Sequence, residues 1–464
     1  MNVEHISSTI SVRERWFLAS TTFLSAAFAF VARLLGTELQ VFAVFVLIPG
    51  LLLVLFSFQT LVFLLLASLF IHPQYLEIAA GAYCSVFLLI SFAVTQRNIT
   101  SRDFWTPMTW PFLIYCLSTV PSVINAADPL VILVKLHNLL AFAIVLHLIP
   151  AAISKKADIT KFLHFYLFLV LLNSIHVIIQ ALLTSRRAFG FAGIMFVDYV
   201  GTGIIIAAIL FITSQGMAKF RYGTLTGVFS IALVLTQTRG VWLVTVLTLF
   251  LLIVFLIWKG QYFGISRKPL IAFALSLGIF FVAVVVGSGR LNPDVAKRTQ
   301  EVVGDAHPAV SEEGYASSSL VTRVLVWSTA YNAFIAHPIV GIGLYTFPVS
   351  SHLYNTLPPI LFNRYVKGLT PHVGYLAVLT ETGIVGLLGF IFFIRAGLRR
   401  VFRPLSFFQG GSDVQYSLIL AWVFVYITIS LFTTDAWLWG QGIVLMGIII
   451  GFVCANEKLV KGMG

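Results

Sequence analysis

Three residues in the second half of the chain have the side chains needed to bind an anion and accept a proton: Arg239, Arg323 and His372. A guanidinium group presents five donors in a planar fork that matches the oxygens of a phosphate or carboxylate. Arg239 lies in "LTQTRGVW" (235–242), where one apolar run ends and the next begins, so a helix N-terminus adds positive potential beside it. His372 lies in "PHVGYLAVLTETGIVG" (371–386), and a neutral imidazole can accept a proton near pH 7.

Each of the three also has an ordinary explanation. Arg239 could extend toward lipid headgroups, Arg323 could be a surface cation, and His372 could be a hydrogen-bonded loop histidine. Two features favour a functional role for Arg239. Its neighbours "TQT" are polar, and arginine is disfavoured on the outer side of a membrane, where this residue is predicted to lie.

The composition places these residues in a membrane protein. Of 464 residues, 59% are hydrophobic and 10% are charged, whereas soluble domains carry about 25% charged residues. The long apolar runs have no period of two, which excludes a β-barrel. We therefore predict an all-α polytopic membrane protein. The net charge of +12 follows the membrane topology and does not indicate nucleic-acid binding, and the three cysteines have no metal-like spacing.

About fourteen spans are predicted, because roughly 20 apolar residues are needed to cross a ~30 Å hydrocarbon layer. They lie at 16–35, 40–57, 59–72, 77–96, 108–125, 129–151, 160–184, 196–214, 222–238, 241–258, 269–288, 372–394, 415–434 and 437–454. "SVRER" before the first span indicates a retained signal anchor with a cytoplasmic basic end. Basic connections such as "AKFRYG" and "RAGLRRVFR" then alternate with acidic or neutral ones such as "TTDAW", which places both termini in the cytoplasm.

The longest break in hydropathy, residues 289–371, falls on the outer side. It separates an N-terminal bundle of about 11 spans (1–288) from about three C-terminal spans (372–464). Within it, "SSLVTRVLVWSTAYNAFIAH" predicts a helix that opens on a serine cap and carries Arg323. Loops this long without a function are uncommon, so we expect a small helical cap over a cavity.

Three further cations are predicted near the outer surface. Arg186 and Arg187 in "TSRRAFGF" depart from the charge rule and could contact headgroups or help to bind a phosphate-bearing donor. Lys135 lies in the outer third of its span, where it could pair with Asp128 or point into a cavity.

Glu381 is a carboxylate inside an apolar run, nine residues after His372. On a straight helix it would point away from His372 and lie roughly 13 Å deeper, so the two cannot act as a pair. We interpret Glu381 as a structural carboxylate that bonds neighbouring helices or backbone.

These segments, in this order, resemble the superfamily of O-antigen ligases and O-antigen polymerases, which are bacterial envelope glycosyltransferases. The segments are "TQTRGVWL", then the arginine with "VLVWSTAYNAFIAHPIVGIGLYTF", then "PHVGYLAVLTETGIVGLLGF". The resemblance covers about 235–395, and the N-terminal half matches by hydropathy alone. It implies a GT-C-like fold of about 12–14 transmembrane helices, with a small helical periplasmic domain between late helices, in the bacterial inner membrane.

The resemblance also implies a reaction: inverting, metal-independent transfer of a glycan from undecaprenyl diphosphate to an acceptor hydroxyl, foremost O-antigen ligation to lipid A–core. Arg239 and Arg323 match arginines that would bind the diphosphate. His372 matches the histidine that opens the next span, as a general base or as a residue that positions the acceptor. The family usually has asparagine after it, where this sequence has Val373. No cofactor is expected, because arginines can neutralise the leaving group and no carboxylate cluster on the outer side suggests a magnesium site.

Several alternatives stay open at this point. An O-antigen polymerase would use the same donor, and exopolysaccharide polymerases and protein-directed oligosaccharyltransferases belong to the same superfamily. A lipid-linked oligosaccharide transporter is the alternative of another class, although the sequence shows no convincing repeat of the kind that transporters carry. A structural scaffold would not explain the outer cations. The expected partners are the lipid-linked donor, a lipid A–core or lipid-linked acceptor, and membrane lipids, with no nucleic acid.

Overall fold

A computed structural model describes the larger part of the chain. The described residues are 105–153, 155–184, 195–267, 319–406, 412–435 and 440–461, with residue 66 and a few positions at 188–189, 270–278 and 438. The spans predicted between residues 16 and 96 lie outside them apart from residue 66, and the span predicted at 269–288 is described only in part.

The described residues form helices and turns with no strand, which confirms the prediction of an all-α protein. Five of the helices in these ranges are long and apolar enough to cross a membrane. They are α8 (Lys156–Thr184), α9 (Phe196–Thr213), α11 (Arg239–Lys259), α17 (Gly374–Phe402) and α19 (Gly440–Lys461). The chain is therefore a multi-pass membrane protein.

The remaining helices of the bundle also follow the predicted spans. They are α6 (Thr109–Thr119), the short 3-10 helix η2 (Val120–Asn125), α7 (Pro129–Ala152), α10 (Gly216–Leu235) and α18 (Ser412–Ser430). Two segments predicted as connections are instead helical: "AKFRYG" lies within α10, and most of "RAGLRRVFR" extends α17 to Phe402. Alanine, leucine, lysine and arginine favour helix, and their long basic side chains can reach water from the end of a span without breaking it.

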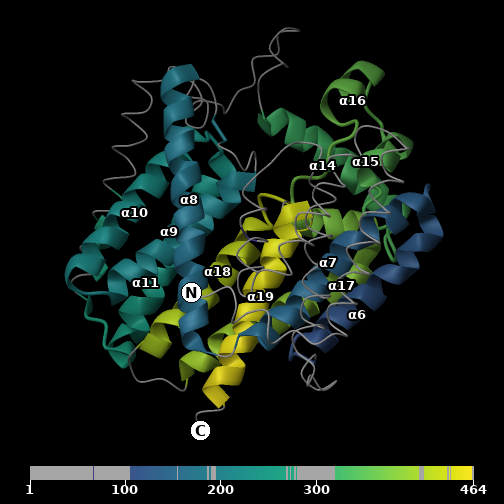
Figure 1. Cartoon of the computed structure of the whole chain (residues 1–464). Coiled ribbons are helices and arrows are strands. Elements are labelled where there is room, and N and C mark those ends of the chain that lie inside the picture. Colours follow the sequence, from purple (N-terminus) through teal and green to yellow (C-terminus); the bar gives the residue numbers. More distant parts are fainter. Residues whose placement is uncertain are drawn as a thin grey trace, which may run out of the picture.

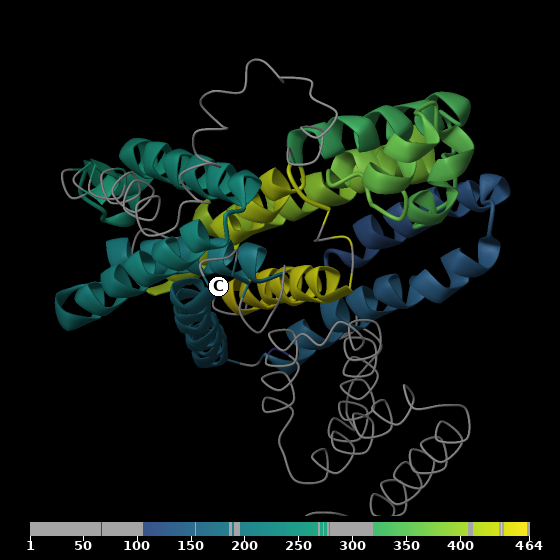
Figure 2. The ribbon, with the colours of Figure 1, turned by 90° about the horizontal axis from the view of Figure 1, so that it is seen from above.

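Close helix packing uses small residues. α19 packs along α7, α17 along α6, and α10 along α9 (Figures 1 and 2). Gly447 and Gly451 of α19 face Phe142 and Ile149 of α7, and a Cβ at Gly451 would lie 2.7 Å from Ile149 Cβ. Glycines four residues apart let two helix backbones approach closely within a membrane, where packing drives association.

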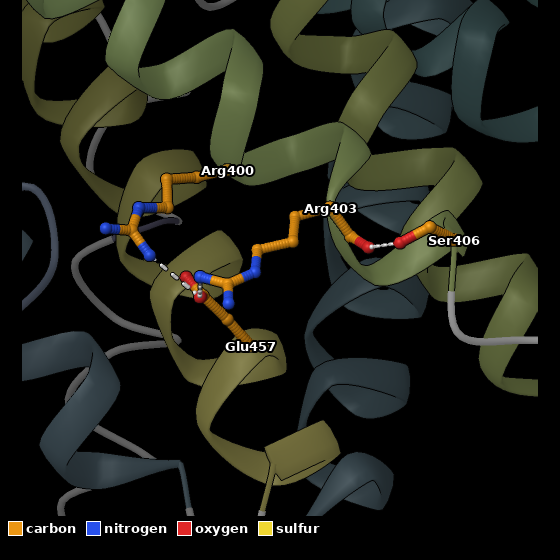
Figure 3. Close-up of polar contacts among 4 residues, drawn as sticks. All are labelled: Arg400, Arg403, Ser406 and Glu457. Carbon is orange, nitrogen blue, oxygen red and sulfur yellow. Dashed lines mark hydrogen bonds and ion pairs between the residues drawn. The ribbon is translucent and has the colours of Figure 1, made fainter.

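The end of α17 is tied to α19 by one carboxylate. Glu457 Oε1 lies 2.9 Å from Arg400 Nη1 and 3.3 Å from Arg403 Nη1 (Figure 3). The glutamate is buried, while both arginines are partly exposed. A buried charge is tolerated when it is paired in this way, so the two arginines hold the end of the long helix against its neighbour.

The described part of the predicted cap, residues 319–371, forms a small helical unit at one end of the bundle (Figures 1 and 2). It contains α14 (Ser319–Ala336), α15 (Phe347–Ser350), the 3-10 helix η6 (Ser351–Tyr354) and α16 (Pro359–Tyr365). These elements share a core that includes Val326, Ala330, Ile342, Phe347 and Phe362.

Glycines join this unit to α17. Gly341 has a φ of 73°, and a Cβ there would lie 2.4 Å from the backbone carbonyl of Glu381. Gly383, inside α17, has a φ of 65°, and a Cβ there would lie 2.3 Å from the carbonyl oxygen of Ile339. The segments "HPIVGIG" and "ETG" therefore contact each other backbone to backbone, which only residues without a Cβ allow.

Candidate functional site

Arg239 occupies the start of a helix, as the sequence predicts. It is the first residue of α11, and the turn that separates it from α10 contains Gln237 with a φ of 54°. A left-handed conformation is uncommon for a residue other than glycine and shows that the turn is tightly constrained. The backbone N–H groups of the first turn of α11 carry partial positive charge, so they add positive potential at this helix end.

Arg323 of α14 reaches the same helix end. A Cβ at Gly240 would lie 3.7 Å from Arg323 Nη2, so the guanidinium group lies against the residue that follows Arg239 in the chain. Residues separated by more than 80 positions thus meet at the start of α11. Arg239 and Arg323, which the resemblance matches to diphosphate-binding arginines, are thus carried by elements that meet at the start of α11.

His372 lies just before α17 in a constrained conformation. The sequence places it at the opening of the span, but the helix begins at Gly374, with Val373 as its N-cap and no side-chain cap. His372 has a φ of 56°, so the chain turns sharply at this residue. The prediction that a straight helix relates His372 to Glu381 is therefore wrong, because only Glu381 lies in the helix.

Asp435 is a member of the site that the sequence reasoning did not single out. It is buried, and its Oδ2 accepts a hydrogen bond from the backbone N–H of His372 at 3.3 Å. Its charge also acts on Arg323 and on the imidazole of His372. In the sequence, Asp435 stands out only as an acidic residue in the outer connection "TTDAW", which indicates topology and not a site.

Burial and charge set the protonation state of His372. Burial lowers the pKa of the imidazole, the nearby Arg323 lowers it further, and the carboxylate of Asp435 opposes both. With its pKa below the ordinary value, the imidazole is neutral at pH 7 and can accept a proton. Burial also lowers the pKa of Arg323, again against Asp435, but a guanidinium remains charged at neutral pH.

A tryptophan bonds the helix that carries Arg323 to the segment that carries His372. Trp327, one turn after Arg323 on α14, donates a hydrogen bond from Nε1 to the carbonyl oxygen of Pro371 at 2.9 Å. Pro371 immediately precedes His372. The helix that carries one predicted site residue is thus bonded directly to the neighbour of another.

The turn after α18, residues 431–435, contacts the start of α11 and the start of α17. Thr433 packs on Gly240, where a Cβ would lie 3.2 Å from Thr433 Cβ. Two carbonyls of the turn accept hydrogen bonds from the N–H of Gly374 at 2.7 and 3.2 Å, and Asp435 contacts His372. These carbonyls accept the N–H of the first residue of α17, and the side chain of Val373 at the N-cap has no acceptor for such an N–H.

Glu381 bonds the backbone of the cap. Its Oε2 accepts a hydrogen bond from the N–H of Tyr345 at 2.9 Å, and its Oε1 accepts one from the N–H of Phe347 at 3.2 Å. The side chain is buried, and Tyr345 has a φ of 63°. These contacts are of the kind expected for a structural carboxylate, and they hold the segment before α15 against α17.

The side chains of the other three predicted cations are not among those that the structure describes. Lys135 lies within α7, but its side chain is not among those described, and Arg186 and Arg187 lie outside the described residues. Their proposed roles in donor binding stay predictions. No group of three potential metal ligands occurs within the part of the chain that the structure describes.

Comparison with known proteins identifies the segment that carries the site. No curated protein matches the chain. A family model described as O-antigen ligase matches residues 224–391, which include Arg239, Arg323 and His372 but end before Asp435. The match confirms the resemblance drawn from the sequence. Residues 224–391 of this multi-pass membrane protein therefore match the O-antigen ligase family.

Proposed function

We propose that this protein transfers a glycan from undecaprenyl diphosphate to an acceptor hydroxyl on the periplasmic face of the bacterial inner membrane, with inversion at the anomeric carbon and without a metal. Lipid A–core is the proposed acceptor. The proposal is carried by one observation: Arg323 lies against the start of α11 at Gly240, while both Arg323 and His372 lie within reach of the charge of Asp435.

The arginines would stabilise the leaving group. As the anomeric C1–O bond breaks, its electron pair goes to the oxygen of the diphosphate, whose negative charge grows. Guanidinium groups that are already in place can bind this charge in a poorly hydrated site without reorganising during the reaction. Arg323 is half-buried, and Arg239 stands at a helix N-terminus, so both have the environment that strengthens such contacts.

His372 would accept the proton. The acceptor oxygen forms a bond to C1 from the side opposite the diphosphate, and its proton moves to the neutral imidazole. Asp435 then faces an imidazolium, which its carboxylate stabilises. The proton passes to water once the product leaves, and the imidazole is neutral again. Asp435 is a positioning residue in this scheme, since it acts through His372.

The arrangement of charge along α17 supports the proposed orientation. His372 precedes the first residue of this helix, whereas Arg400 and Arg403 lie at its other end. The helix is kinked at Gly383, and its part from Ile384 to Phe402 alone corresponds to roughly 28 Å. A basic cluster at one end of a long span is typical of the cytoplasmic side, so the site at the other end would face the periplasm.

The decisive experiment is to identify the product that the purified protein makes from a defined lipid-linked glycan, with and without lipid A–core. A ligase produces glycan-bearing lipid A–core and makes no product when the core is omitted. A polymerase lengthens the lipid-linked glycan in both mixtures. No transfer in either mixture, by protein whose folding is verified by its thermal unfolding, would contradict the proposed function. The matched control is Arg323→Gln, which should lose the activity in either case.

A further inference from the structure

A second site lies at the end of the bundle remote from the candidate active site. It is a cavity of about 320 Å³, lined by the end of α9, the start of α10, the segment after α11 and the start of α18. α11 connects the two places: it begins at Arg239 and ends at Lys259, just before the 3-10 helix η4 (Gly260–Phe263). Its 21 residues correspond to about 30 Å, so the cavity lies near the opposite membrane surface.

The described part of the cavity wall carries a positive charge. Lys219 is the charged residue among the described residues that line it. The Nζ of Lys219 lies 5.1 Å from the centroid of the Phe211 ring, which holds the ammonium group at the wall of the cavity. A lysine held in this way attracts an anion.

Two helices begin beside the cavity. α10 begins at Gly216, and its N-cap residue Gln215 lines the cavity without capping the helix through its side chain. Val414 and Gln415, in the first turn of α18, line the other wall. The first backbone N–H groups of a helix have no intrahelical acceptor and carry partial positive charge, so the start of α10 adds to the attraction of Lys219, whereas the first turn of α18 already contains the acidic Asp413.

The remaining lining is polar on one part and apolar on another. Hydroxyl groups come from Thr213, Ser214 and Ser266, and Gln415 Nε2 donates a hydrogen bond to Thr213 Oγ1 at 2.8 Å, which fixes the amide. Phe263 and Leu270 supply the apolar part. The volume is at the lower end of the range for sites of small ligands. Such a site suits an anion attached to an apolar group.

We propose that this cavity binds a phosphate ester, with the phosphate at Lys219 and the start of α10 and with the apolar part of the ligand beside Phe263 and Leu270. An anionic phospholipid from the adjacent leaflet has this chemistry, and so in part does free phosphate. The binding is separate from glycosyl transfer and does not depend on it.

The test measures lipid binding directly. Delipidated full-length protein in detergent is titrated with phosphatidylglycerol, with phosphatidylcholine and with inorganic phosphate, and bound molecules are counted by native mass spectrometry. Phosphatidylglycerol should bind more tightly than phosphatidylcholine. Lys219→Gln should weaken its binding about fivefold, the effect typical of one basic residue near a membrane surface. The matched control is Lys259→Gln, an exposed lysine at the same end of the bundle that does not line the cavity.

Ser266→Trp provides a second variant that fills the cavity and leaves Lys219 in place; it should also weaken binding of phosphatidylglycerol. Competition by inorganic phosphate at concentrations similar to those of the lipid would identify soluble phosphate as the ligand and support the anion site. Equal weakening by Lys219→Gln and Lys259→Gln, or equal binding of the two lipids, would overturn the proposal. Thermal unfolding of each variant in the same detergent shows whether it is folded.

Discussion

The backbone N–H of His372 donates a hydrogen bond to Oδ2 of Asp435 at 3.3 Å, across 63 residues of sequence. This contact joins the residue before α17 to the turn after α18. It also places a buried negative charge beside the imidazole and beside Arg323, so the carboxylate acts on both the proposed base and one of the proposed diphosphate ligands.

Replacing Asp435 with asparagine should shift the acid limb of the pH–rate profile to lower pH. Asparagine can still accept the N–H of His372, but it removes the charge that raises the pKa of the imidazole, so the pKa falls. His372 then stays neutral to lower pH. The rate on the plateau should also fall, because the imidazolium that forms during transfer is no longer stabilised. The measurement is kcat/KM between about pH 5 and 8, where an unperturbed histidine titrates. An acid limb that does not move would contradict the coupling.

Replacing His372 with asparagine should reduce kcat by roughly 10²- to 10⁴-fold if the imidazole is the general base. Asparagine suits this position because it tolerates the left-handed conformation that His372 adopts, so the backbone is preserved. His352→Ala is the control, since His352 is an exposed histidine of the cap. Turnover close to that of the unmodified protein would remove the assignment of His372 as a base, and a change in KM for the acceptor alone would leave it a positioning role.

Arg323→Gln should reduce kcat about 10²- to 10³-fold, the loss typical when one preorganised donor to a developing anion is removed. Arg323→Lys should recover part of the activity, because lysine restores the charge but not the paired donors of the guanidinium. Arg364→Gln, which changes an exposed arginine of α16, controls for loss of positive charge from the cap. Similar losses for Arg323→Gln and Arg364→Gln would indicate a general effect of surface charge.

Gly341→Ala should lower the midpoint of thermal unfolding far more than Gly368→Ala. The two glycines have similar φ values, 73° and 77°, so alanine is strained by about 1 kcal/mol at either position. At Gly341 the added Cβ would also lie 2.4 Å from the backbone of Glu381, whereas nothing lies within 4 Å at Gly368. The difference between the variants therefore measures the backbone contact between the cap and α17. Equal midpoints at the same scan rate would show that this contact is not as close as described.

Chelation of divalent cations should leave the rate of transfer unchanged, since arginines are proposed to neutralise the diphosphate. The measurement is activity after treatment with excess EDTA, compared with the same sample supplied with magnesium. Loss of activity that magnesium restores would show that a metal takes part.

The spans of the bundle could be predicted because they depend on a property that each segment carries by itself. α7 runs from Pro129 to Ala152 where hydropathy places a span at 129–151, since a continuous apolar run in lipid has to satisfy its backbone internally. The end of α17 was placed too early for a related reason. Hydropathy falls at the arginines after Ile394, but the helix continues to Phe402, because basic side chains at a membrane surface are compatible with helix.

The members of the site were harder to predict because they depend on contacts between distant segments. Arg323 and His372 could be found from their types and from their family motif, yet nothing in the sequence shows that Trp327 bonds Pro371 between them. Asp435 has no motif of its own and lies beyond the matched family segment. Its importance follows only from the fold, which brings the end of α18 to the start of α17.

The bond from Trp327 to Pro371, together with the backbone contacts at Gly341 and Gly383, limits how substrates can enter. Trp327 of α14 bonds the segment before α17, and the segment that follows α14 contacts the backbone of α17. An outward movement of α14 would therefore break these contacts. In the proposed function, a bulky glycan would therefore reach the start of α11 without an outward movement of α14.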